Sequence, residues 1–249
     1  MSFPISEIEF KRNAVEPVVC IKAGLELVKT NYWLFVAMVF LVTISGVVPF
    51  GLLLAPMMCG LYLTLFRARR GQPIEFGNLF EGFNYFGDAV IAALLHIIPI
   101  LVIIVPAYII FYVGLFAAIG LSQISGNEPN PAALIGFLVV ILVIWFVVMV
   151  VVIVISVVFI FAYPLIVDRR LSGLNAVKLS IRAGWANFWR LLGMMLLCGL
   201  MVFVGALFCY VGALFVAPIM YGALASAYEQ VFGLGQPSPN IPPAPPSFA

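Results

Sequence analysis

Four long intervals without any Asp, Glu, Lys or Arg constrain this sequence more than any other feature. They cover residues 30–66, 89–127, 129–167 and 191–228 and contain 37, 39, 39 and 38 residues. About 20 helical residues cross a hydrocarbon core about 30 Å thick, so each interval is nearly twice as long as one crossing requires. A transmembrane barrel would instead show segments of about 10 residues with alternating polarity, which this sequence lacks. The intervals therefore predict an all-α integral membrane protein.

Composition and charge support this class and narrow the possible functions. Mean hydropathy is +1.21, and 65% of the residues are hydrophobic, which is far above the range of soluble domains. The net charge of +2 comes without an aromatic-basic stripe, so we expect no nucleic-acid partner. The cysteines show no CxxC pair and no neighbouring histidine cluster, which is typical of buried, unreactive thiols. We expect no metal and no cofactor. The cysteines are Cys20, Cys59, Cys198 and Cys209.

The number of spans depends on the first and last charge-free intervals, which contain helix breakers near their middles. Proline removes a helical hydrogen bond and glycine favours turns, so each interval is interpreted as a hairpin of two short helices. The breakers are Gly46, Pro49, Gly51 and Pro56 in the first interval, and Gly205, Gly212 and Pro218 in the last.

The distribution of basic residues favours this interpretation. With two hairpins, all 12 Lys and Arg lie on one side of the membrane, whereas four single crossings would divide them eight to four. Basic residues near the ends of spans mark the cytoplasmic side. We therefore expect a multi-pass protein of the inner (cytoplasmic) membrane with both termini in the cytoplasm. The six expected spans are approximately residues 32–47, 50–66, 89–117, 133–165, 190–208 and 211–228.

The chain divides into three parts. Residues 1–12 form an N-terminal segment, in which Glu7 and Glu9 precede any apolar run, the wrong order for a signal peptide. Residues 13–233 form the membrane domain. Residues 234–249 are rich in proline and carry no charge. Such a composition cannot form a core and predicts a disordered tail.

Two amphipathic segments, residues 14–29 and 172–186, are expected to lie along the inner membrane surface. In each segment, apolar residues recur at helical spacing and basic residues occupy another face. Basic groups on such a helix point toward anionic lipid headgroups. The apolar stripes are Val18, Ile21, Leu25 and Val28 in the first segment, and Leu171, Leu174, Val177, Ile181 and Trp185 in the second.

The same regions indicate a degenerate internal repeat. Ile21-Lys22-Ala23-Gly24 parallels Ile181-Arg182-Ala183-Gly184, and Ala-Pro-x-Met-x-Gly occurs over residues 55–60 and again over 217–222. Both copies begin and end on the expected cytoplasmic side, which describes a parallel repeat about an axis along the membrane normal. Such a repeat would either bracket a central cleft or form a duplicated scaffold.

Several short motifs are spread along residues 14–233. They are Gly-Leu-Leu-Leu-Ala-Pro at 51–56 followed by Gly60 and Tyr62, Arg70-Gly71, the Phe-rich segment 76–86, Tyr163-Pro164, Asp168, Ala176, Ser180, Trp189, Pro218 and Tyr228. In these motifs the chain resembles a broad group of poorly characterised bacterial membrane proteins, the DUF975-like proteins and the membrane domain attached to some glycerophosphodiester phosphodiesterases. The resemblance implies a six-helix bundle without an agreed activity. In the phosphodiesterase members, catalysis lies in a separate soluble domain.

Two pairs of ionisable residues are the first candidates for chemistry. Asp88 and His96 are eight positions apart, about 12 Å along a helix and about 80° around it, so they cannot share a proton directly. We interpret Asp88 as a helix start and His96 as a packed, hydrogen-bonded histidine. Glu75 and Glu81 flank Phe-rich sequence at helical spacing, which predicts a short helix lying on the membrane. No nucleophile motif or phosphate-binding loop is present, so we expect no enzymatic activity.

Basic residues near the ends of the inner-facing spans and on the second amphipathic segment suggest a site for anionic lipid headgroups. The expected function is a non-enzymatic membrane protein that organises lipids or partner membrane proteins, or associates with itself, at the cytoplasmic interface. The alternative is a transporter of a small apolar or lipid-like solute through a cleft between the repeats. The expected lipid-binding residues are Arg67, Arg69, Arg70, Arg169, Arg170, Lys178 and Arg182.

Overall fold

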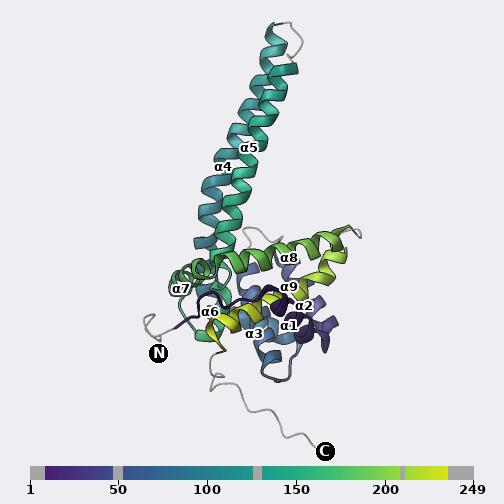
Figure 1. The fold of residues 1–249 in the computed structure, drawn as a ribbon, viewed down its shortest axis with the longest axis vertical. Coiled ribbons are helices and arrows are strands. Elements are labelled where there is room, and N and C mark those ends of the chain that lie inside the picture. The colour runs from purple at the N-terminus through teal and green to yellow at the C-terminus, as the bar shows by residue number, and fades with distance from the viewer. Residues whose placement is uncertain (1–8, 47–52, 126–130, 208–210, 235–249) are drawn as a thin grey trace, which may run out of the picture. The chain divides into compact units, whose positions relative to one another are not determined.

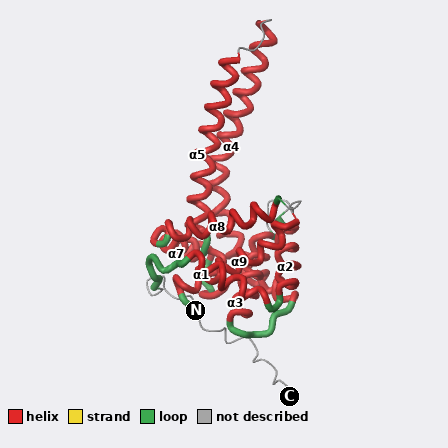
Figure 2. The backbone as a smooth tube through the Cα atoms, turned by 45° about the vertical axis from the view of Figure 1, so that its right-hand side comes forward, coloured by secondary structure: helices red, strands yellow, loops and turns green. Residues whose placement is uncertain are grey.

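The computed structural model describes residues 9–46, 53–125, 131–207 and 211–234. All regular secondary structure within these ranges is helical, which confirms the all-α class (Figure 2). Nearly all of the proline-rich tail lies outside the described residues, as do Cys209 and most of the N-terminal segment.

The helices of the described residues follow one another with short connections (Figure 1). They are α1 (Pro17–Lys29), α2 (Tyr32–Ser45), α3 (Leu54–Arg69), the 3-10 helix η3 (Phe76–Tyr85), α4 (Phe86–Ser125), α5 (Pro131–Phe159), α6 (Ala162–Arg169), α7 (Gly173–Ala186), α8 (Phe188–Ala206) and α9 (Val211–Phe232).

The chain forms two compact units. Residues 1–93 and 157–249 make up the first unit, and residues 94–156 make up the second. In the first unit, α9 packs against α1, α2 and α8, while α3 packs against η3 and α6. Its interior contains aromatic rings from α3, α9 and the turn before α6, with Phe66 and Phe161 lying 5.3 and 6.2 Å from the ring of Tyr228.

Backbone contacts at glycine position the helices of the first unit. Gly24 of α1 lies against α9, where a β-carbon on Gly24 would lie 2.7 Å from the carbonyl carbon of Gly222. Gly60 of α3 lies against η3, and a β-carbon on it would overlap the carbonyl oxygen of Leu79. Only a residue without a side chain permits such approaches.

The second unit consists of the long arms of α4 and α5, which run side by side (Figure 1, Figure 2). Gly114 of α4 accommodates the ring of Phe137 of α5, and the rings of Tyr108 and Trp145 meet edge to face at 4.9 Å. Most of the large apolar side chains along both arms are exposed, as expected for helices surrounded by hydrocarbon.

Three segments are long and apolar enough to cross a membrane, and four if α1 and α2 count as one span bent by 104°. This is compatible with a multi-pass membrane protein but does not confirm six spans. The three are residues 76–117, 135–169 and 188–206. Helices α2 and α3 contain 14 and 16 residues, which correspond to about 21 and 24 Å and fall short of the hydrocarbon thickness.

One expected span differs from the observed helices, and one expected short helix is present. The span expected over residues 133–165 is interrupted, because α5 ends at Phe159 and α6 begins at Ala162. Pro164 lies in the first turn of α6, where its missing N–H is tolerated but would break a helix continuing from α5. The short helix expected around residues 76–86 is present as the 3-10 helix η3.

The internal repeat is not confirmed by the packing. All four repeated glycines make close backbone contacts, but their partners differ between the copies. Gly24 and Gly222 lie against each other, whereas Gly60 lies against Leu79 and Gly184 against Val158. The shared sequence therefore marks positions of close approach without demonstrating a symmetric arrangement.

Candidate functional site

The basic residues predicted to bind lipid lie at three places in the first unit. The end of α3 carries Arg67, Arg69 and Arg70, the end of α6 carries Arg169 and Arg170, and α7 carries Lys178 and Arg182. The first two places are rich in intramolecular contacts, and the third is not.

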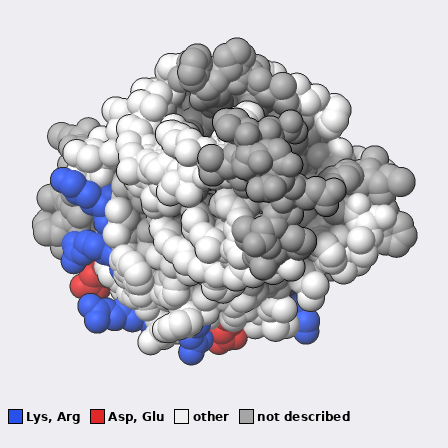
Figure 3. All heavy atoms as spheres, turned by 90° about the horizontal axis from the view of Figure 1, so that it is seen from above, with Lys and Arg blue, Asp and Glu red and all other residues white. Residues whose placement is uncertain are grey.

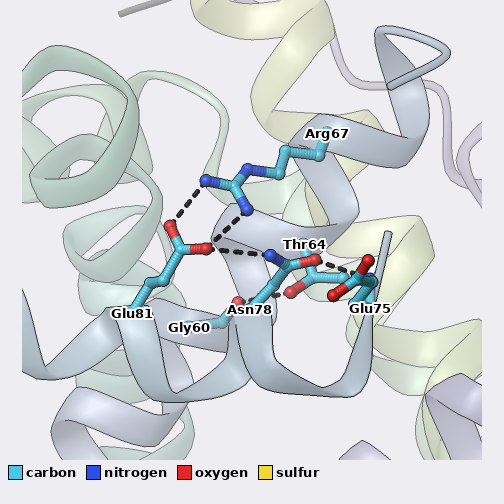
Figure 4. Close-up of polar contacts among 6 residues, drawn as sticks. All are labelled: Gly60, Thr64, Arg67, Glu75, Asn78 and Glu81. Carbon is cyan, nitrogen blue, oxygen red and sulfur yellow. Dashed lines mark hydrogen bonds and ion pairs between the residues drawn. The ribbon is translucent and has the colours of Figure 1, made fainter. Parts of the chain in front are cut away.

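Arg67 forms a two-point ion pair with Glu81 of η3 (Figure 4). Its Nη1 and Nη2 donate to the two carboxylate oxygens at 2.7 and 2.5 Å. The side-chain amide of Asn78 donates to the same carboxylate at 2.8 Å, and its carbonyl oxygen accepts from the Glu75 backbone N–H. The Glu75 carboxylate in turn accepts from the Asn78 backbone N–H, which completes a capping box. These contacts attach η3 to α3.

Asp168 is the centre of a second polar cluster. Its side chain is fully buried. One carboxylate oxygen accepts from Arg70 Nη2 at 2.8 Å and the other from the hydroxyl of Tyr228 at 2.9 Å. Arg169 Nε lies 3.3 Å from the second oxygen. Because a buried carboxylate requires such compensation, this cluster is a structural connection between α3, α6 and α9.

The remaining contacts of these arginines lie at the end of α9. Arg169 Nη2 donates to the carbonyl oxygens of Phe232 and Gly233 at 2.9 and 3.3 Å, where the last helical carbonyls favour a cation. Arg69 pairs with Glu229 at 2.7 Å, and each side chain is about one third exposed. Arg67, Arg69, Arg70 and Arg169 are therefore engaged with groups of the chain itself, and Arg170 is not without a partner.

Sequence reasoning missed the partners in these contacts. Asp168, Tyr228 and Glu229 were given no role, although each lies at an end of a charge-free interval and close to a basic residue in space. One feature of the sequence could have indicated these contacts, namely the isolated carboxylate of Asp168 directly before Arg169. A single acid at the end of a long apolar interval favours an internal ion pair, since an unpaired carboxylate there is costly.

Lys178 and Arg182 have a different environment. Both are exposed and one turn apart on α7, and within the described residues neither lies within ion-pairing distance of a carboxylate. Helix α7 contains no acidic residue. Trp185 shares this exposed face at 57% exposure, and Trp189, in the first turn of α8, is 80% exposed. We call Lys178, Arg182, Trp185 and Trp189 the α7 basic-aromatic face.

The structure divides the predicted apolar stripe of the second amphipathic segment, in which Leu171 and Val177 are buried. The buried face of α7 combines Val177 and Leu179 with small residues. Gly184 lies against the backbone of Val158, and the Ser180 hydroxyl donates to the Val158 carbonyl oxygen at 2.8 Å. Leu174 and Trp185 of the predicted apolar stripe are instead exposed, on the same side as the basic residues. In α1, similarly, Val18 and Leu25 are exposed while Cys20, Gly24 and Val28 are buried.

Helix α1 carries a more balanced charge. Lys22, Glu26 and Lys29 are all exposed, and the carboxylate lies four positions after one lysine and three before the other, at spacings that favour attraction on a helix. The space-filling view shows a similar mixture, since the acidic side chains visible there lie beside basic ones (Figure 3). Among the two amphipathic helices, only α7 presents basic groups without a neighbouring acid.

Asp88 lies in the first turn of α4, as expected, and has a second role. Its carboxylate accepts from the Gly173 backbone N–H at 2.9 Å, which places a negative charge at the first residue of α7, where the helix dipole favours it. His96 is half-buried further along α4. Among the described residues, no group of three or more His, Cys, Asp or Glu side chains is arranged to hold a metal ion.

Asn187, between α7 and α8, holds the segment that precedes α1. Its side chain is fully buried. The amide oxygen accepts from the Ala14 backbone N–H at 3.0 Å, and the amide nitrogen donates to the carbonyl oxygens of Lys11 and Ala183 at 3.1 and 3.0 Å. Arg190 donates to the Val15 carbonyl oxygen at 3.2 Å. One side chain thus satisfies two backbone groups outside the helices, the Ala14 N–H and the Lys11 carbonyl oxygen.

Replacing Asn187 with Ala is expected to lower the free energy of unfolding of the first unit by about 1–3 kcal/mol, because buried backbone groups lose their partners. Limited proteolysis should then cut near Lys11 faster than in the unmodified protein. Asn175→Ala is the control, since Asn175 is half-buried on α7 and makes no side-chain hydrogen bond within the described chain. Equal cleavage rates in the two variants would contradict the assigned role.

No protein-family model, curated protein or solved structure matches this chain. The function proposed below therefore depends on the geometry of the chain itself.

Proposed function

We propose that this protein is a non-enzymatic multi-pass membrane protein that binds anionic lipid headgroups through the α7 basic-aromatic face and organises lipids or partner membrane proteins at the cytoplasmic interface. The observation that carries the proposal is the exposure of Lys178 and Arg182 without a carboxylate partner on the helix that also exposes Trp185, with the exposed ring of Trp189 in the first turn of α8. Tryptophan is enriched at the water-lipid boundary, and basic side chains there attract anionic headgroups.

The contacts within the first unit narrow the lipid site relative to the seven residues expected from sequence. An arginine already paired with a buried carboxylate gains little from a lipid phosphate, because it must first give up its own partner. Arg70 and Arg169 have such a partner in Asp168, and Arg67, itself largely buried, is held by a two-point ion pair with Glu81. The two basic residues of α7 need no such exchange, so they are the residues we assign to headgroup binding.

The transport alternative has less support. It requires a cleft between two symmetric repeats, and the glycines shared by the repeats pack on different partners. The inner-membrane location and the cytoplasmic orientation of both termini are part of the proposal, supported by the placement of all 12 basic residues on one side under the hairpin interpretation.

Combining Lys178→Gln with Arg182→Gln is expected to weaken the binding of phosphatidylglycerol about thirtyfold. Each basic residue near an anionic surface contributes about 1 kcal/mol, so two contribute about 2 kcal/mol. The full chain is purified from nanodiscs that contain phosphatidylglycerol and phosphatidylcholine. Mass spectrometry then measures the amount of phosphatidylglycerol that the chain retains. Retention of phosphatidylcholine should be unchanged.

The matched control combines Lys22→Gln with Lys29→Gln on α1, which removes the same charge from a helix whose basic residues flank Glu26. This variant should retain phosphatidylglycerol within about threefold of the unmodified protein. Raising the ionic strength to about 1 M should reproduce the loss seen on α7, because the screening length falls to about 3 Å. Equal retention by the two double variants would refute headgroup binding by α7.

A further inference from the structure

Three tyrosines of the first unit lie together, one on each of three helices. Tyr62 belongs to α3, Tyr163 to α6 and Tyr221 to α9. Helix α3 packs against both α6 and α9. The rings of Tyr62 and Tyr221 meet edge to face at 6.4 Å, and the Tyr163 hydroxyl is near enough to interact electrostatically with the other two. We call these three residues the tyrosine layer.

Within the described residues, the hydroxyls of the tyrosine layer make no hydrogen bond to the protein. Other tyrosines of the first unit do. Tyr32 donates to the Phe215 carbonyl oxygen at 2.6 Å, and Tyr228 donates to Asp168 at 2.9 Å. A buried tyrosine hydroxyl normally has a partner. Tyr62 is only 2% exposed, yet its hydroxyl is not one of the fully enclosed polar atoms that lack a partner. It therefore faces space that a ligand can enter.

The tyrosine layer lies about one and a half to two turns inward from the charged ends of its helices. Tyr62 precedes Arg70 by eight positions, and Tyr163 precedes Asp168 by five, which correspond to about 12 and 8 Å along a helix. Each headgroup region of a bilayer is about 5–8 Å deep. With the charged ends among the headgroups, the tyrosine layer lies at the edge of the hydrocarbon, beside the ester carbonyl oxygens of glycerolipids.

The charges around the tyrosine layer favour a neutral ligand. Arg70 and Arg169, at the ends of α3 and α6, are paired with the buried Asp168 carboxylate. The Cys59 thiol of α3 interacts electrostatically with the layer and with Asp88, so a carboxylate lies on that side. A phosphate would be repelled by this carboxylate and would have to compete for paired arginines. Neutral hydroxyls suit neutral acceptors.

We infer that the tyrosine layer binds diacylglycerol, a neutral glycerolipid with two ester carbonyl groups and one free hydroxyl. Two tyrosine hydroxyls donate to the two carbonyl oxygens, and the third exchanges a hydrogen bond with the lipid hydroxyl. Tyr163 and Tyr221 are half-buried, so the layer reaches the surface of the first unit and the acyl chains stay in the surrounding hydrocarbon. The inference rests on the membrane location in the proposed function and uses no residue of α7.

Retention of dioleoylglycerol by the full chain tests this site. The chain is purified from nanodiscs that contain phosphatidylcholine and dioleoylglycerol, and mass spectrometry measures both lipids. The triple variant Tyr62→Phe, Tyr163→Phe and Tyr221→Phe removes only the hydroxyls. It is expected to bind dioleoylglycerol about a hundredfold more weakly, which is about fivefold for each hydrogen bond. Retention of phosphatidylcholine should be unchanged.

Tyr32→Phe is the matched control, because the hydroxyl that it removes is bonded to the Phe215 carbonyl oxygen. This variant should retain as much dioleoylglycerol as the unmodified chain. A second measurement needs no substitution and uses the dioleyl ether of glycerol, which has the same hydroxyl and chains but no carbonyl groups. The unmodified chain should bind this ether at least tenfold more weakly than dioleoylglycerol.

Unfolding midpoints in mild detergent show whether the triple variant is folded. Without dioleoylglycerol its midpoint should equal that of the unmodified chain, since the lost hydroxyls have no partner in the described protein. Added dioleoylglycerol should raise the midpoint of the unmodified chain only. Absence of dioleoylglycerol from the unmodified chain, equal retention by the triple variant, or equal binding of the ether would overturn the inference.

The two lipid sites can fail separately. The variant that combines Lys178→Gln with Arg182→Gln should keep dioleoylglycerol, because α7 contributes no residue to the tyrosine layer. The triple phenylalanine variant should keep phosphatidylglycerol, because it leaves every basic residue in place. Loss of both lipids in either variant would show that the two sites are one, which would also overturn the inference.

Discussion

Replacing Asp168 with Asn is expected to lower the free energy of unfolding of the first unit by about 3–5 kcal/mol, the largest effect of any single charge change in the described chain. The carboxylate is fully buried and is shared by Arg70, Arg169 and Tyr228. Its neutralisation leaves two partly buried guanidinium groups without their counter-charge, while the amide that replaces it can accept at only one oxygen.

The measurement is the unfolding midpoint of the purified chain in mild detergent, followed by tryptophan fluorescence. Trp185 and Trp189 lie within the first unit but are exposed, so their fluorescence changes little on unfolding. Circular dichroism at helical wavelengths is therefore recorded in parallel. Tyr228→Phe, which removes one hydrogen bond to the carboxylate, should produce a smaller loss of about 1.5–3 kcal/mol.

The Arg69 and Glu229 pair provides the control for Asp168→Asn. It also joins α3 to α9 through a carboxylate and an arginine, at 2.7 Å, but both side chains are about one third exposed. Exposed pairs contribute about 0–1 kcal/mol because water solvates the separated charges almost as well. Glu229→Gln should therefore change the midpoint only slightly. If Glu229→Gln and Asp168→Asn destabilised the chain equally, burial would not be the source of the effect.

Long intervals without charged residues were sufficient to predict where helices occur. The segments expected to be helical at residues 14–29 and 172–186 contain α1 and α7, and the long interval from 89 to 127 corresponds to α4. Helix length was less predictable. Within a uniformly apolar interval, core and lipid accept the same side chains, so the sequence contains little information on where α2 and α3 begin and end.

The buried faces were harder to predict than the helices. The predicted apolar stripe included Leu174 and Trp185, which are exposed, whereas Gly173, Ser180 and Gly184 are buried beside Val177 and Leu179. A membrane protein gains nothing by moving a leucine from lipid into its core, so small residues that allow helices to approach determine the packing. The polar contacts of Asp168 also depend on residues 60 and 98 positions away, which local sequence does not reveal.

Substituting Gly60 with Val tests this role of small residues most directly, and we expect it to abolish accumulation of the folded chain or to cost more than about 4 kcal/mol. A β-carbon on Gly60 would overlap the Leu79 carbonyl oxygen, and one on Gly82 would overlap the Pro56 carbonyl oxygen. Because both obstacles are backbone atoms, no rotation of a side chain relieves them. Helix η3 must move away from α3.

Displacement of η3 has a measurable consequence besides stability, since η3 supplies Glu81 to Arg67. The variant Gly60→Ala is milder than Gly60→Val. In that variant, a pair of cysteines introduced on α3 and η3 should no longer form a disulfide. Gly77→Ala is the matched control on the same 3-10 helix, because a β-carbon there meets no atom within 4 Å. It should be neutral or stabilise the chain by about 0.4–1 kcal/mol through the unfolded state. Equal unfolding midpoints for Gly60→Ala and Gly77→Ala would show that backbone contact does not hold these helices together.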